Sequence, residues 1–106
     1  MSDWSVAIFS TGAAARIIGV QPKTLINYEN WGLFSPERTA TGRRQYSRED
    51  IFEIMAIRYL LETKKLTING VLFALELISL ASEQGLDLRE QILPEEARIQ
   101  IEARIP

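Results

Sequence analysis

The chain contains neither cysteine nor histidine among its 106 residues. Their absence excludes disulfides, thiol nucleophiles, imidazole bases and most zinc or copper sites. No glycine loop of the kind that cradles phosphates is present, and the adjacent acids Glu49 and Asp50 fit a helix start better than a catalytic pair. We therefore predict a protein that is not an enzyme and that uses no metal and no cofactor.

Long hydrophobic runs and targeting segments are also missing. The first residues, MSDWSVAIFS, lack the basic region and apolar stretch of a secretory signal. The longest apolar-rich stretch, Leu66 to Ala81, is interrupted by Asn69 and Glu76 and is too short to cross a bilayer. The length fits one domain. We expect a cytoplasmic protein without membrane contact, associated with the nucleoid if it binds DNA.

Charge is scarce overall but unevenly placed. The formal net charge is −2, yet residues 10–65 carry nine Lys or Arg against six Asp or Glu, and residues 66–106 carry three against seven. Four arginines fall within residues 36–48, PERTATGRRQYSR. A locally basic surface can bind a polyanion whatever the sum of charges. Charge alone leaves a merely solvated surface equally open.

Local signals predict a mainly α fold that begins with two short helices. Ser10 is a candidate N-cap, and Gly19 ends the first helix after about two turns. Pro22 suits the first turn of a second helix, which Gly32 ends. Two short helices joined by a Gly-Val-Gln turn are typical of a helix-turn-helix.

Two more helices are expected after a short β-hairpin. The hairpin, or wing, pairs residues 34–39 with 43–46 around an exposed loop at residues 40–42. Ser47, with Asp50 three residues on, predicts a capping box for a third helix. Thr67 caps a fourth helix that runs to about Gln84, so that Gly85 closes a domain over residues 1–85.

The fourth helix is apolar on two faces, and a four-helix unit this small covers only one of them. Either the chain's own C-terminal extension, residues 86–106, or a second subunit must cover the other, and we favour a dimer. The alternation over residues 97–105 predicts a strand, although Pro94 with two glutamates favours a helix start. The expected dimer contacts are Phe73, Leu77, Leu80, Ile99 and Ile101.

The motif order resembles the N-terminal DNA-binding domain of the MerR family of bacterial transcription regulators. The resemblance rests on residues 9–51, FSTGAAARIIGVQPKTLINYENWGLFSPERTATGRRQYSREDI, and covers roughly residues 9–78. Arg43-Arg44 and the LTINGV segment at 66–71 are most similar to the heat-shock repressor and glutamine-synthetase repressor branches. The resemblance implies a winged helix-turn-helix that binds an inverted-repeat operator as a homodimer.

The second helix and the wing would then face the DNA. Amides can pair with adenine, lysine can reach guanine or phosphate, and wing arginines can bind the backbone or enter the minor groove. Tyr28 and Tyr46 also fit a supporting position in the core. The candidate DNA-binding residues are Arg16, Gln21, Lys23, Thr24, Asn27, Tyr28, Arg38, Arg43, Arg44 and Tyr46.

Two departures from the family leave alternatives open. Ile26 stands where the family has an arginine, and only about 20 residues follow Gly85 in place of a long dimerisation helix and an effector domain. We therefore expect regulation, if any, through a protein partner, expression level or oligomeric state. Besides a dimeric repressor, the sequence is compatible with an architectural, excisionase-like DNA-binding protein. It is also compatible with a protein-interaction module that has lost DNA contact.

Overall fold

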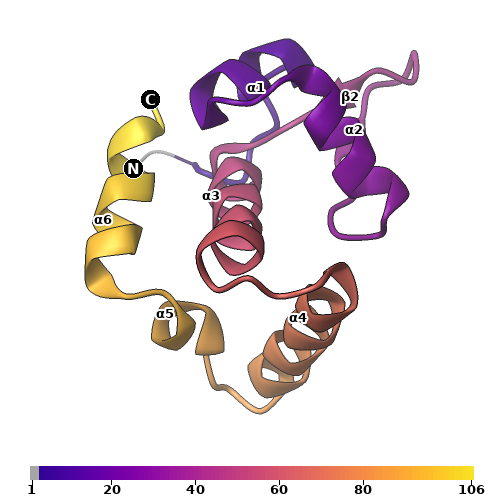
Figure 1. Ribbon diagram of the computed structural model, residues 1–106. Helices are drawn as coiled ribbons and strands as arrows, with labels where there is room; N and C mark the ends of the chain where they lie inside the picture. The colour runs from indigo at the N-terminus through magenta and orange to yellow at the C-terminus, as the bar shows by residue number, and fades with distance from the viewer. Residues whose placement is uncertain (1–2) are drawn as a thin grey trace.

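The chain folds into a winged helix-turn-helix followed by three further helices (Figure 1). The computed structural model describes residues 3–106, with the side chain of Glu90 excepted. The elements are, in order, α1 (Thr11–Ile18), α2 (Pro22–Asn30), β1 (Glu37–Arg38), β2 (Arg44–Gln45), α3 (Arg48–Arg58), the π-helical turn η1 (Tyr59–Thr63), α4 (Ile68–Glu83), α5 (Leu88–Ile92) and α6 (Glu95–Arg104).

The helix-turn-helix forms where the sequence predicts it. The Ser10 hydroxyl accepts a hydrogen bond from the backbone N–H of Ala13, which caps α1. Gly19 ends this helix with a φ of 90°, a left-handed conformation that favours glycine. Pro22 then occupies the first turn of α2, where its missing N–H leaves no bond unmade.

The wing is a two-stranded antiparallel hairpin, as expected, although its strands are shorter than predicted. Glu37 pairs with Gln45 and Arg38 with Arg44. The hairpin leads directly into α3, whose start is a complete capping box. The Ser47 hydroxyl accepts from the N–H of Asp50 at 3.0 Å, and the Asp50 carboxylate accepts from the N–H of Ser47 at 2.9 Å.

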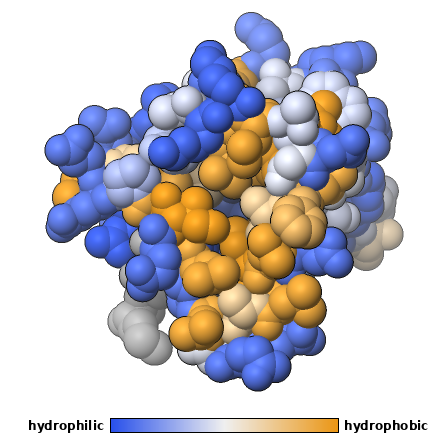
Figure 2. Space-filling model, turned by 60° about the horizontal axis from the view of Figure 1, so that its bottom comes forward, coloured by the Kyte–Doolittle hydropathy of each residue, from blue (hydrophilic) through white to orange (hydrophobic). Residues whose placement is uncertain are grey.

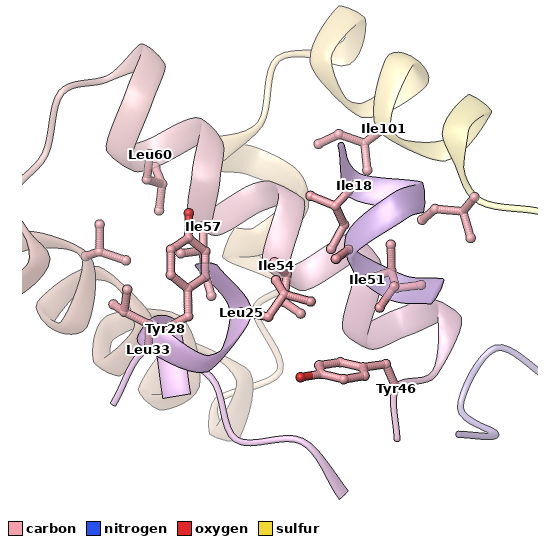
Figure 3. Close-up of a cluster of buried hydrophobic side chains, with 14 of the residues drawn as sticks. Ile18, Leu25, Tyr28, Leu33, Tyr46, Ile51, Ile54, Ile57, Leu60 and Ile101 are labelled. Carbon is pink, nitrogen blue, oxygen red and sulfur yellow. The ribbon is translucent and has the colours of Figure 1, made fainter. Parts of the chain in front are cut away.

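Helix α3 runs through the centre of the core (Figure 3). Its residues Ile51, Ile54 and Ile57 recur every three positions and are almost completely buried. Ile18 of α1 and Leu25 of α2 pack into the same cluster, as Figure 3 shows. The two helices that precede the wing are therefore held at a fixed position on α3.

The predicted C-terminal strand is wrong, because residues 95–104 form the helix α6. The alternating segment also places Ala97, Ile101 and Ile105 four residues apart, which is one face of a helix. Burial selects that face: Ile101 and Ile105 join the core, while Ile99 remains 55% exposed. Ile101 is thus a residue of the chain's own core, which corrects its assignment as a dimer contact.

Helix α6 packs back on the helix-turn-helix rather than away from it. It lies along α3, and its Arg104 Nε donates a hydrogen bond to the Ile17 carbonyl at the end of α1. Arg48 Nε donates to the carbonyl of Pro106 at 2.6 Å. Gly85 makes the predicted turn, with a φ of 83°, but Leu93 and Ile101 from beyond it share one core with the segments before it.

Within residues 3–106, no helix combines the length and the apolar character that crossing a bilayer requires.

Candidate nucleic-acid interface

The exposed side of α2 is a polar strip on a helix that is otherwise anchored in the core. Leu25 and Tyr28 point inward and are buried. Lys23 is exposed, and Thr24 and Asn27 are half-exposed on the other side of the helix. Gln21, at the N-cap, is exposed and makes no side-chain cap bond. The strip combines an ammonium group, a hydroxyl and two amides, which are groups that read base edges and phosphates.

A network around Glu29 ties the wing to α2. Arg44 Nε donates to Glu29 Oε1 at 2.6 Å, and Arg38 Nη2 donates to Oε2 of the same carboxylate at 3.0 Å. The two arginines lie opposite each other on β1 and β2, so one carboxylate bridges both strands. The Arg44 hydrogen bond is the main reason why the pKa of Glu29 lies below its usual range, and Arg38 adds to the effect.

The wing loop is ordered by its own polar groups. The N–H of Thr39 donates to the Arg43 carbonyl at 2.8 Å, and the Arg43 N–H donates to the Thr39 hydroxyl at 3.1 Å. Arg38 Nη1 also donates to the carbonyl of Gly42, whose φ of 85° makes the turn. The wing is thus a closed unit held at a defined distance from α2.

Arg43 differs from its two neighbouring wing arginines. It is exposed at the loop and makes no ion pair with any residue in the described part of the chain. It borders a shallow depression between the wing and the start of α1, lined also by Ser10, Thr11 and Gly12. The first turn of α1 carries no acidic residue, so its free N–H groups and Arg43 present positive charge to the same space.

Two predicted contact residues are removed from the surface. Tyr46 is 1% exposed, stacks on Phe34 with ring centroids 6.3 Å apart, and has a buried hydroxyl without a hydrogen-bond partner among the described residues. Tyr28 is 5% exposed, and burial raises the pKa of its hydroxyl. Both rings support the core, which corrects their assignment as DNA contacts.

Glu29 thus joins α2 to the wing, and the two elements together are here called the α2–wing face: it comprises Gln21, Lys23, Thr24 and Asn27 of α2, with Arg38, Arg43 and Arg44 of the wing. Arg16 is exposed on α1, and within residues 3–106 no ion pair joins it to this face. Ile26 is half-buried. Sequence reasoning missed Glu29, because its partners lie nine and fifteen residues away and no local pattern indicates the pairing.

Comparison with known proteins agrees with this geometry. A family model described as "MerR HTH family regulatory protein" matches residues 9–77, which include α1, α2, the wing and most of α4. A protein named "Putative heat shock protein HspR", from Streptomyces coelicolor (strain ATCC BAA-471 / A3(2) / M145), is 32% identical over 76 residues. The matched segment is 72% of this chain and 50% of that relative, so the chain aligns with half of the relative's length.

Proposed function

The chain belongs to the MerR HTH family of regulatory proteins, and from that premise we propose that it binds double-stranded DNA through the α2–wing face and regulates transcription. The observation that carries the proposal is the bridge from Glu29 to Arg38 and Arg44, because it holds the wing and α2 in one rigid arrangement. A rigid arrangement of groove-reading and backbone-binding groups is what a winged helix-turn-helix requires.

The two parts of the face have different roles. Asn27 and Gln21 supply amides that pair bidentately with adenine, while Lys23 reaches guanine or phosphate. Arg43 binds the phosphate backbone beside the groove, together with the N-terminal amides of α1. Arg38 and Arg44 act mainly by holding the wing on α2, since Glu29 already occupies their guanidinium groups.

We further propose that the protein acts as a dimeric repressor. Helix-turn-helix proteins read two half-sites related by symmetry, and the resemblance to a protein named for heat shock supports a regulatory role in a stress response. Repression requires only that the bound dimer obstruct a promoter. Action on chromosomal DNA places the protein in the cytoplasm, at the nucleoid.

The proposal is tested by selecting duplexes from a random pool with the purified chain at two salt concentrations, followed by sequencing. Enrichment of an inverted repeat, lost at high salt, is the expected result. Enrichment of adjacent direct repeats would replace the regulator with an architectural DNA-binding protein. No enrichment and no retention even at low salt would overturn DNA binding and favour a protein-interaction module.

A matched variant shows whether the α2–wing face is responsible. Replacing Lys23 and Asn27 together with alanine should abolish enrichment, because both side chains lie on the outer side of α2. The same two changes at the exposed residues Lys64, which follows η1, and Asn69, in the first turn of α4, should leave the selected sequence unchanged. Repression is then read from a reporter whose promoter overlaps the selected site.

A further inference from the structure

A tryptophan is exposed at the end of α2, next to the polar strip. Trp31 directly follows the last residue of α2 as its C-cap, with φ −85° and ψ 0°, so the backbone is still close to helical there. The residue is 45% exposed. An exposed indole combines a large apolar area with an N–H donor, a combination that is typical of contact surfaces.

Helical spacing places Trp31 in line with two groups of the α2–wing face. Lys23, Asn27 and Trp31 follow one another at intervals of four residues, and side chains four apart are neighbours on a helix. The backbone N–H of Trp31 donates to the Asn27 carbonyl at 2.9 Å, so the helical hydrogen bonding extends to this residue. A row therefore runs from the ammonium group of Lys23, past the Asn27 amide, to the indole.

The core supports the indole from one side. The ring of Tyr28, which is buried, lies with its centroid 6.2 Å from that of Trp31, at an interplanar angle of 35°. Gly32 follows with a φ of 78°, a left-handed conformation that ends the helix directly after the tryptophan. The buried tyrosine thus backs the indole and leaves part of it open to solvent.

The free polar groups along this row favour an anionic ligand. Within residues 3–106 the indole N–H has no hydrogen-bond acceptor and Lys23 makes no ion pair. An indole can donate but cannot accept, so its partner must supply an acceptor. Glu29, the single acidic residue of α2, is already held by the two wing arginines. Phosphate oxygens accept strong hydrogen bonds because they are charged.

The exposed apolar side chains of α4 have different surroundings. Phe73, Leu77 and Leu80 lie on one side of that helix and are all exposed. Figure 2, which turns the bottom of Figure 1 forward, shows apolar side chains gathered over this part of the molecule. Trp31 instead adjoins the amide of Asn27 on α2. An apolar cluster suits another apolar surface, whereas an indole beside polar groups suits a polar ligand.

We propose that Trp31 contacts the DNA backbone at the edge of the groove that α2 enters, with its indole N–H donating to a phosphate oxygen and its ring against the adjoining deoxyribose. A helix-turn-helix places the N-terminal residues of its second helix at the base edges. Trp31 lies seven residues beyond Thr24, about 10 Å further along the helix axis. An axis inclined across a major groove about 12 Å wide therefore brings Trp31 to the backbone. The inference rests on the proposed function and adds the contact that seats the far end of α2.

Tryptophan fluorescence tests the contact directly, because the chain contains two tryptophans. Trp4 borders a depression lined by residues of α3, α5 and α6 and by none of α2. A Trp4→Phe chain reports Trp31 alone, and a Trp31→Phe chain reports Trp4 alone. Adding the selected duplex should quench Trp31 and leave Trp4 unchanged. Unchanged Trp31 emission at saturating DNA, or a change that dilution of the protein alone reproduces, would overturn the proposal.

Matched substitutions measure what the indole N–H contributes. Trp31→Phe keeps an aromatic ring and removes the donor, and it should weaken binding of the selected duplex about tenfold, the loss expected for one hydrogen bond to a charged group. Trp4→Phe is the same exchange at the other tryptophan and should bind like wild type. A phosphate carries no sequence information, so the loss should be equal across single-base variants of the site. A loss confined to one base pair would overturn the backbone contact.

Failure of this inference and failure of the proposed function give different results. If wild type binds the duplex and Trp31→Phe binds it equally well, only the Trp31 contact is overturned. If wild type retains no duplex even at low salt, the function itself is overturned. Far-UV circular dichroism and the urea midpoint of Trp31→Phe should match those of wild type, which separates a lost contact from a lost fold.

Discussion

The α2–wing face and the exposed apolar side of α4, formed by Phe73, Leu77 and Leu80, lie on one small core but are built by opposite means. Polar groups order the first: one carboxylate holds two arginines, and the wing loop is closed by its own hydrogen bonds. The second is a row of apolar side chains on a helix whose opposite side is buried. The first therefore suits a hydrated, charged ligand, and the second suits another helix. Substitutions that impair one surface and leave the other intact test whether the two surfaces have separate roles.

The largest effect is expected from the core that both surfaces share. Ile54→Ala should lower the free energy of unfolding by about 2–5 kcal/mol, because it leaves a cavity in the centre of α3, where Ile54 is 1% exposed. Urea denaturation followed by circular dichroism measures the change. Ile99→Ala, on the outside of α6, is the matched control and should be close to neutral. Equal losses from both would show that α3 is not the centre of the core.

The next effect concerns which bases the α2–wing face reads. Asn27→Ala should reduce discrimination at one base pair of each half-site by about 1–3 kcal/mol, since a bidentate amide–adenine pair is lost. Competition binding with single-base variants of the selected site measures the discrimination. Dimerisation should be unchanged, because Asn27 lies on α2 and not on the exposed apolar side of α4. A uniform loss across all sequences would assign Asn27 to the backbone instead.

A smaller effect, independent of sequence, is expected at the wing loop. Arg43→Ala should reduce the slope of log affinity against log salt by about one, as one phosphate contact is lost. Fluorescence anisotropy at several salt concentrations gives the slope. Lys64→Ala removes a comparable exposed charge near α4 and should leave the slope unchanged. If both variants changed the salt slope equally, Arg43 would contribute only to the overall electrostatic field of the protein and not to a specific phosphate contact.

The smallest expected effect is a pH dependence of folding stability, and it comes from Glu29 in the α2–wing face. The pKa of Glu29 is lowered in the folded chain, chiefly by the Arg44 hydrogen bond, so its contribution is present above the unfolded pKa and lost as the pH falls through the folded value. Partly exposed pairs contribute at most about 1 kcal/mol. Wild type should therefore lose slightly more stability on acidification than Glu29→Gln. Thermal melts across the acidic range measure the difference, with Glu37→Gln, an exposed wing residue, as control.

The helix-turn-helix, the wing and α3 were predictable from the sequence because short-range chemistry specifies them. Ser10, Gly19 and Pro22 act on backbone groups within four residues, and the Ser47–Asp50 box closes within one turn. Most of the α2–wing face followed from these elements. The role of Arg44 did not, because a surface arginine beside DNA and an arginine paired with Glu29 look the same in the sequence.

In the C-terminal segment, local sequence patterns were not sufficient to predict the secondary structure. Its alternating pattern fits a strand with one apolar face, yet the same letters place Ile101 and Ile105 on one side of a helix. Packing against α3 selects the helix, because it buries those two side chains in the core. The burial of Tyr28 and Tyr46 is a second example, since a tyrosine suits both a core and a phosphate contact.

The sequence alone was therefore sufficient to predict the helix caps, the turns, the basic wing loop and the excess of apolar surface on α4. Each depends on neighbours within a few positions, where backbone geometry leaves few choices. Tertiary packing decided that Arg38 and Arg44 brace the wing while Arg43 stays exposed, and that α6 covers its own domain. Those outcomes join residues far apart in the chain, and the free energy that selects them comes from burial and from charges that meet only after folding.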